Sequence, residues 1–108
     1  MILVIIRMKV LAEKRKELSQ TIASLIGSIR REKGCGRCDF YRSMEDENEL
    51  CILEEWETRD NLDSHLKSER FRVLRGAMSL LQEPYEMMAY TVLHPAGMVG
   101  SILSSERS

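Results

Sequence analysis

The chain has 108 residues, a length that fits one folded domain and is too short for two independent cores. Hydrophobic residues make up 44% and charged residues 31%, which is typical of a globular protein and unlike a disordered tail or a membrane bundle. The formal net charge is -1, so no overall field draws the chain to nucleic acid or acidic lipid, and we expect neither a nucleic-acid nor a membrane partner.

The first predicted element is a β-strand over residues 2–10. Its aliphatic, β-branched start is typical of a strand that is covered on both faces. The apolar run meets Arg7 after only a few residues, whereas the centre of a signal peptide needs roughly 7–15 apolar residues. We therefore expect a cytoplasmic chain, in which three cysteines stay reduced.

A long amphipathic helix is predicted over residues 13–33. Its apolar positions recur at helical spacing on one face: Leu18, Ile22, Leu25, Ile26 and Ile29. Charged residues cover the rest of its surface. Gly34 follows, at the position where a left-handed C-terminal cap is favoured. Two strands come next, at about residues 38–44 and 49–57, and the four polar residues between them suit a hairpin turn.

The following region is predicted to hold two short helices rather than one. The first starts at Thr58, with Asp60 and Asn61 as competing caps. The second starts near Ser68, where a kink interrupts the pattern. An apolar stripe with a period of three to four residues marks this second helix: Phe71, Leu74, Met78 and Leu81.

The last predicted strand, Tyr85 to Leu93, has the apolar character of a buried strand. The order β-α-β-β-α-β predicts an α+β, ferredoxin-like fold, in which helices cover one face of a four-stranded antiparallel sheet. Because the first and last strands are apolar on both faces, we expect a homodimer in which a partner's sheet covers the second face. We assign residues 1–94 to this domain and residues 95–108 to a C-terminal tail, which either adds an edge segment across the dimer or frays.

One acidic residue stands out on the strand at residues 49–57. Alternation places Glu54 on the same face as Ile52 and Trp56, so its carboxylate is partly desolvated and its pKa rises toward the range of a useful acid or base. Pairing with a basic residue or a helix N-terminus is the commoner fate of such a group, and this structural interpretation stays open.

His65 shares a helix face with Leu62 and Leu66, so its ring points at the sheet or at a cavity beneath the helix. Imidazole titrates near neutrality and can take a proton from a phenol or a hydroquinone. A core histidine with satisfied hydrogen bonds would show the same pattern, so both interpretations remain. For His94, which precedes Pro95 at a strand end, we favour a structural role.

The cysteines Cys35 and Cys38 have the C-x-x-C spacing of thiol–disulfide enzymes. The motif follows the C-terminus of a helix, however, and the helix dipole lowers a thiol pKa only at the N-terminus. A zinc site would need two further ligands, and Cys51 with a single histidine provides no recognisable pattern. We therefore interpret the spacing as accidental and expect no metal site.

The segment from Glu54 to Phe71 resembles the antibiotic biosynthesis monooxygenase family, which includes the quinol monooxygenases. Its hallmark is a strand that ends in Glu-x-Trp, followed by a short helix with His-Leu and a Ser-x-x-Phe entry to the next helix. The residues of this chain that match family motifs are Lys33-Gly34-Cys35, Tyr41-Arg42-Ser43, Glu54-Glu55-Trp56, His65-Leu66 and Ser68 to Phe71. The resemblance spans about residues 2–93 and implies a ferredoxin-like monomer that pairs into a dimeric α/β barrel.

The resemblance also implies an activity. Characterised members oxidise hydroquinones or polycyclic phenols with O₂ and without metal or flavin, so the implied function is a cofactor-independent monooxygenase with a small aromatic substrate. His65, Trp56 and Glu54 match the family motif in position and would supply the base, the aromatic wall and the exclusion of water that this reaction needs. Some relatives degrade heme with a histidine on the later helix, which this chain lacks. The alternative is a noncatalytic dimeric barrel that binds a small apolar ligand.

Overall fold

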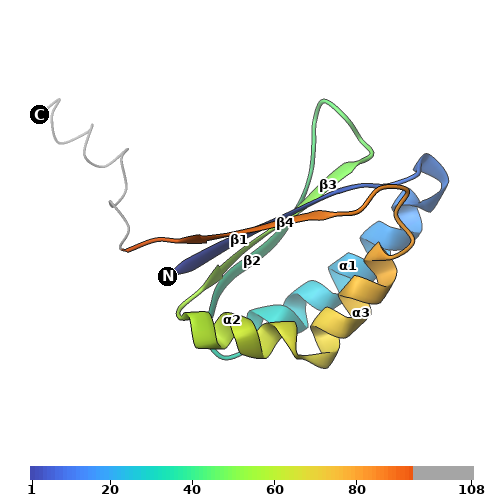
Figure 1. Cartoon of the computed structure of the whole chain (residues 1–108). Helices are drawn as coiled ribbons and strands as arrows, with labels where there is room; N and C mark the ends of the chain where they lie inside the picture. Colours follow the sequence, from blue (N-terminus) through green and yellow to red (C-terminus); the bar gives the residue numbers. More distant parts are fainter. Residues whose placement is uncertain (94–108) are drawn as a thin grey trace, which may run out of the picture.

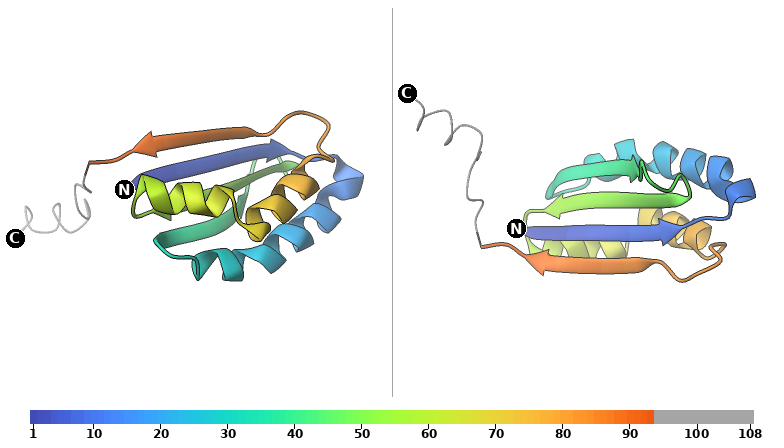
Figure 2. Two further views of the ribbon diagram at one scale, coloured as in Figure 1. Left: turned by 60° about the horizontal axis from the view of Figure 1, so that its bottom comes forward. Right: turned by 90° about the horizontal axis from the view of Figure 1, so that it is seen from above.

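Four antiparallel strands form a sheet with helices on one of its faces in the computed structural model, which describes residues 1–93 (Figure 1). The strands are β1 (Ile2–Lys9), β2 (Cys35–Arg42), β3 (Glu49–Trp56) and β4 (Glu86–Thr91). They lie in the order β2-β3-β1-β4, which the right-hand view of Figure 2 shows from the uncovered side. This architecture confirms the predicted α+β, ferredoxin-like class. His94 and the proposed tail at residues 95–108 lie outside the described residues.

Helix α1 (Arg15–Arg30) follows a short 3-10 turn, η1 (Ala12–Lys14). The helix ends before the predicted limit at residue 33, because the chain turns at Arg31, which is the C-cap. Gly34 adopts the expected left-handed conformation, with a φ of 81°. It closes the turn into β2, however, and does not cap the helix itself.

The two short helices are α2 (Arg59–Leu66) and α3 (Glu69–Met78), with the break between them as predicted. Each begins at a residue whose hydroxyl accepts a backbone hydrogen bond, Thr58 from Asn61 N–H and Ser68 from Phe71 N–H. Thr58 is therefore the cap of α2, and Asp60 and Asn61 are not. No helix among residues 1–93 is both long enough and apolar enough to cross a membrane.

Strand β2 begins at Cys35 and not at residue 38, so its predicted start is wrong. The turn at Gly34 brings Cys35 opposite Trp56 at the end of β3, and the register of the two strands shifts at a bulge between Cys35 and Arg37. The Cys-Gly-Arg start has no apolar alternation, which is why the sequence pattern missed it. The C-x-x-C motif therefore lies within a strand.

Strand β4 is not buried within one chain, which corrects the expectation of a buried strand from Tyr85 to Leu93. It is an edge strand that pairs only with β1, and most of its residues are exposed. Met88 and Tyr90 are 52% and 47% exposed on the sheet face opposite the helices. That a second chain covers this face in a homodimer stays a prediction.

The core fills the space between the helices and the covered face of the sheet. Alternation along β1 and β3 directs one set of aliphatic side chains into it: Ile2, Val4, Ile6, Met8, Leu50 and Ile52. Two polar side chains are buried in the same layer, Glu54 at 0% and His65 at 1% exposure. Buried polar groups are costly without partners, so their surroundings mark the candidate site.

Candidate functional site

Three residues singled out from the sequence meet in the core. Trp56 Nε1–H donates a 2.8 Å hydrogen bond to Glu54 Oε1 from the neighbouring position on the same face of β3. The His65 ring, from α2, stacks on the Trp56 indole with centroids 4.6 Å apart and an interplanar angle of 26°. His65 Nε2 lies 3.8 Å from Glu54 Oε2. Of the two orientations expected for His65, the ring therefore faces the sheet.

Aromatic rings enclose the imidazole of His65 on two sides. Trp56 covers one face, and Phe71 of α3 meets the ring in an edge arrangement with centroids 5.5 Å apart. Phe71 is held at the first turn of α3 by the Ser68 cap. This surrounding excludes water and strengthens any electrostatic interaction that the imidazole makes.

A residue that the sequence analysis did not single out completes the site. His65 Nδ1–H donates a 2.9 Å hydrogen bond to Glu32 Oε2, and Arg70 Nε lies 3.1 Å from the same oxygen as an ion pair. Glu32 lies at the end of the segment predicted as the first, highly charged helix, yet its side chain is only 10% exposed. No local pattern connects it to a histidine 33 positions later in the chain.

The surroundings of Glu54 both raise and lower the pKa of its carboxyl. Burial raises its pKa above the ordinary value, and the negative charge of Glu32 acts in the same direction. The hydrogen bond from Trp56 and the nearby imidazole of His65 partly offset this by favouring the charged form. The net effect is a carboxyl that holds its proton more tightly than usual.

Two polar atoms at the centre of the site lack hydrogen-bond partners. Among the described residues, Glu54 Oε2, His65 Nε2 and Arg70 Nε are the buried side-chain polar atoms without one. The first two face each other across 3.8 Å, which is too long for a hydrogen bond. The carboxyl oxygen and the imidazole nitrogen can each form a hydrogen bond with a hydroxyl group that enters beside them.

A surface hollow of about 570 Å³ lies at one end of the sheet, next to Trp56. Trp56 borders it, together with the turn that leads into β2, the start of β1, the end of β3 and the chain after β4: Met1, Gly34, Cys35, Gly36, Glu55, Glu57 and Leu93. The hollow is open to solvent, and its volume exceeds the roughly 150 Å³ of a cavity that binds benzene. Of Glu54, Trp56 and His65, Trp56 alone borders it, and its side chain is fully buried.

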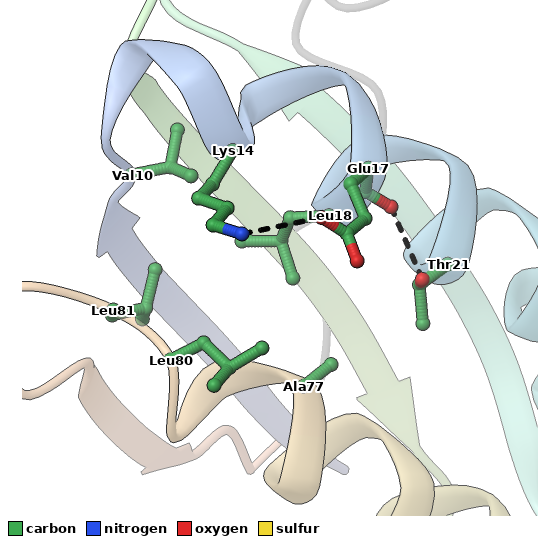
Figure 3. A pocket seen from close by; sticks show the side chains of 8 residues that line it. All are labelled: Val10, Lys14, Glu17, Leu18, Thr21, Ala77, Leu80 and Leu81. Atoms are coloured by element: carbon green, nitrogen blue, oxygen red, sulfur yellow. Dashed lines mark hydrogen bonds and ion pairs between the residues drawn. The ribbon is translucent and has the colours of Figure 1, made fainter.

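A second hollow lies between the start of α1 and the end of α3 (Figure 3). Its floor is apolar, and the ion pair between Lys14 and Glu17 lies at its rim. Its volume is about 50 Å³, whereas a cavity that binds benzene has roughly 150 Å³. The hollow is therefore too small to hold an aromatic ring as it stands.

The cysteines show no sign of thiol chemistry. Burial raises the pKa of Cys38 to about 12, and burial raises that of Cys35 as well, so both stay protonated at neutral pH. This agrees with an accidental C-x-x-C spacing. Within the described part of the chain, no group of three or more His, Cys, Asp or Glu side chains could hold a metal ion.

Comparisons with known proteins point to one family. The sequence profile described as Antibiotic biosynthesis monooxygenase matches residues 1–76. A conserved protein from Methanosarcina mazei Go1 is 30% identical and has a TM-score of 0.78, with 82% of this chain and 89% of that chain covered. Rv0793 from Mycobacterium tuberculosis is 28% identical and has a TM-score of 0.81, with 89% and 98% covered.

A more distant structure shares the fold alone. A protein from Nitrosomonas europaea that bears the name of an antibiotic biosynthesis monooxygenase is 21% identical and has a TM-score of 0.81. The match covers 87% of this chain and 100% of that chain. No curated protein matches the sequence.

Proposed function

Because this chain belongs to the antibiotic biosynthesis monooxygenase family, we propose that it is a monooxygenase that oxidises a small aromatic diol or polyphenol with O₂. The observation that supports this most strongly is the pair of unpartnered atoms, Glu54 Oε2 and His65 Nε2, beside the Trp56 indole. A substrate hydroxyl beside this pair would find a proton acceptor in an aromatic, water-poor surrounding.

The proposed reaction starts with the removal of a hydroxyl proton by His65 Nε2. The resulting anion is electron-rich and passes an electron to O₂. For a hydroquinone, the overall reaction gives a hydroxyquinone and water: one oxygen atom enters the ring and the other leaves as water. The diol supplies all four electrons, two from its oxidation to the quinone and two from the conversion of C–H to C–OH. The reaction thus balances without an added reductant.

Each of the three residues has a distinct role in this proposal. His65 is the base, and Trp56 is the wall against which the substrate ring stacks. The Trp56 N–H also fixes Glu54, whose raised pKa keeps a proton close to the reacting oxygen atoms. All three side chains are buried, so the substrate enters from the hollow beside Trp56 by moving the indole away from His65.

O₂ uptake with a panel of hydroquinones and polyphenols tests this function. We expect uptake above that of heat-inactivated protein, and we expect His65→Ala to lower the rate by on the order of 10²–10⁴. The matched control is Asp63→Asn, which changes a partly exposed residue on the same helix and should leave the rate unchanged. Uptake no greater than that of the heat-inactivated protein, with every compound, would rule out the activity for this panel.

The alternative function is a noncatalytic barrel that binds a small apolar ligand. It is favoured by the direct packing of His65 on Trp56, which leaves both rings buried within the core. In the uptake experiment this alternative gives binding of the aromatic compounds without consumption of O₂. Binding is followed by the fluorescence of the single tryptophan, Trp56.

We also propose that two chains pair through the uncovered face of the sheet. Leu3, Ile5 and Leu53 lie on this face and are only half-buried, and Met88 beside them is about half exposed. The right-hand view of Figure 2 looks onto the strands that carry them. A second copy of the same face would cover this apolar surface. We place the end of the domain near residue 94, shortly after the last strand.

A further inference from the structure

A buried hydrogen bond connects His65 to a distant part of the chain. Its Nδ1–H donates to Glu32 Oε2, which belongs to the turn between α1 and β2. A carboxylate has only acceptors, so the proton of a neutral His65 stays on Nδ1 and the lone pair stays on Nε2. Nε2 is the atom that faces Glu54, and it has no hydrogen-bond partner.

The turn that carries Glu32 is fastened to its neighbours. Glu32 N–H donates to Ile29 O at 3.0 Å, and Cys35 N–H donates to Glu32 O at 3.1 Å. Gly34 O accepts a 2.8 Å hydrogen bond from Glu57 N–H, which ties the turn to the end of β3. The backbone on both sides of Glu32 is therefore held in place.

Gly34 also fixes the distance between this turn and α2. A Cβ at Gly34 would lie 2.2 Å from the side chain of Asn61, so only glycine permits such close packing. Asn61 lies one helical turn before His65 on α2. The close approach of Gly34 and Asn61 therefore keeps Glu32 and His65 at hydrogen-bond distance.

Arg70 holds the Glu32 carboxylate from the solvent side. Its Nε lies 3.1 Å from Glu32 Oε2, and its side chain is 40% exposed on α3. The charge of Arg70 offsets that of Glu32 and orients the carboxylate from a third element. A charge pair with one partner partly exposed to water adds little net stability, so stability alone does not account for this arrangement.

We propose that Glu32 is a positioning residue of the site: it fixes the tautomer and orientation in which His65 presents Nε2 to the substrate. This inference rests on the proposed function. When Nε2 takes the hydroxyl proton of the substrate, the imidazolium keeps its Nδ1–H on the Glu32 carboxylate, whose negative charge stabilises it. The proton ends in the water that the reaction releases.

The charged and titratable groups around His65 come from three elements: Glu32 in the turn, Glu54 on β3, and Arg70 on α3 behind Glu32. Cys35 and Cys38 on β2 lie near Glu54. The raised pKa of both cysteines keeps them neutral over the pH range in which an imidazole titrates. The acidic groups that face the His65 ring are therefore Glu32, at Nδ1, and Glu54, at Nε2.

Glu32→Gln tests the inference, because it keeps the size of the side chain and removes its charge. We expect kcat to fall on the order of 10²–10⁴, as it does when a histidine base loses its orienting carboxylate, with a much smaller change in KM. The rising limb of kcat against pH should move to lower pH, because the imidazolium loses its counter-charge. Glu69→Gln is the control, since Glu69 is exposed beside Arg70 on α3.

A spectroscopic readout makes the test independent of activity. The ¹⁵N spectrum of the imidazole reports its tautomer directly, and the chain has only two histidines. We expect the Nδ1–H tautomer at His65 in the wild type and its partial or full loss in Glu32→Gln, because the amide N–H₂ can itself donate to Nδ1. Glu32→Asp should keep the wild-type tautomer and restore part of kcat.

The two proposals fail in different ways. If the wild type consumes no O₂, the proposed function fails, and the tautomer alone decides the role of Glu32. An unchanged His65 tautomer in Glu32→Gln overturns the inference, and so does an unchanged kcat and pH profile in an active enzyme. If Glu32→Gln does not fold, Glu32→Asp carries the test: a reduced kcat with wild-type Tm supports the inference, and a wild-type kcat overturns it.

Discussion

The carboxyl of Glu54 is fully buried, and this sets how it contributes to stability at each pH. Burial is the main cause that raises its pKa in the folded chain above the value of 4.5 that applies when it is unfolded. Between these two values the folded state binds more protons than the unfolded state, so the free energy of unfolding falls as the pH rises. The contribution of Glu54 is thus present at low pH and is lost through the folded-state pKa.

Glu54→Gln should therefore stabilise the protein, and more so as the pH rises. The amide oxygen of the glutamine can accept a hydrogen bond from the Trp56 N–H, and its N–H₂ group can donate one to His65 Nε2. The two positions that lack hydrogen-bond partners in the wild type would then be paired. We expect the Tm difference from wild type to be small near pH 4 and to grow toward pH 7. Thermal unfolding at several pH values measures it. A Tm difference independent of pH, as we expect for the exposed control Glu45→Gln, would contradict the account.

Sequence reasoning located these residues to different degrees. Alternation along β3 predicted that Glu54 and Trp56 share one face, and both are buried. Helical spacing predicted that His65 faces inward, but it left open whether the ring points at the sheet or at a cavity. Glu32 could not be found in this way, because its partner lies 33 positions away and the two meet only through the packing of the turn on α2. Contacts between elements carry no local periodicity.

Most of the helices and strands follow from sequence patterns. Periodicity predicted the number and type of the elements, and hydroxyl caps predicted where α2 and α3 begin. The start of β2 was missed because pairing with β3 determines it, and its first residues have no strand pattern. The end of α1 was missed because Arg31 and Glu32 are good helix formers that tertiary contacts place in a turn.

Two glycine substitutions with opposite expected effects test this view of the turn. Gly34→Ala forces an alanine into the left-handed conformation, which lowers the free energy of unfolding by roughly 1–2 kcal/mol. Its Cβ would also clash with the side chain of Asn61. Gly27→Ala, within α1, meets nothing within 4 Å and should stabilise the helix by about 0.5–1 kcal/mol. Denaturant unfolding measures both. Equal effects of the two variants, or a stable Gly34→Ala, would show that the turn is not constrained as described.

At the scale of the whole molecule, one face of the sheet lacks a cover within the chain. The register places Asp39, Leu53, Ile5 and Met88 in one row across all four strands of this face. At roughly 25 cal/mol per Å², each 100 Å² of apolar surface that a second chain buries contributes about 2.5 kcal/mol. Burial of a few hundred Å² therefore contributes a free energy comparable to the whole stability of a typical domain, so we expect a stable dimer.

Leu53→Lys should separate the dimer without unfolding the monomer. The substitution places a charge at the centre of the proposed interface, on a side chain that is only half-buried within one chain. Sedimentation velocity should show a dimer for the wild type and a monomer of unchanged circular dichroism for the variant. Glu45→Lys, in the exposed loop before β3, is the control and should remain dimeric. A wild-type monomer at micromolar concentration would rule out this interface.

Transfer of one atom of O₂ to an aromatic substrate at the Glu54–His65 pair can be followed by mass spectrometry of the product formed under ¹⁸O₂, with rapid quenching to prevent exchange of carbonyl oxygen with water. We expect the wild type to incorporate a single ¹⁸O atom per product molecule, and we expect His65→Ala to form almost none of this product. A product oxidised to the quinone without ¹⁸O, or equal labelling by both proteins, would rule out this reaction at this pair.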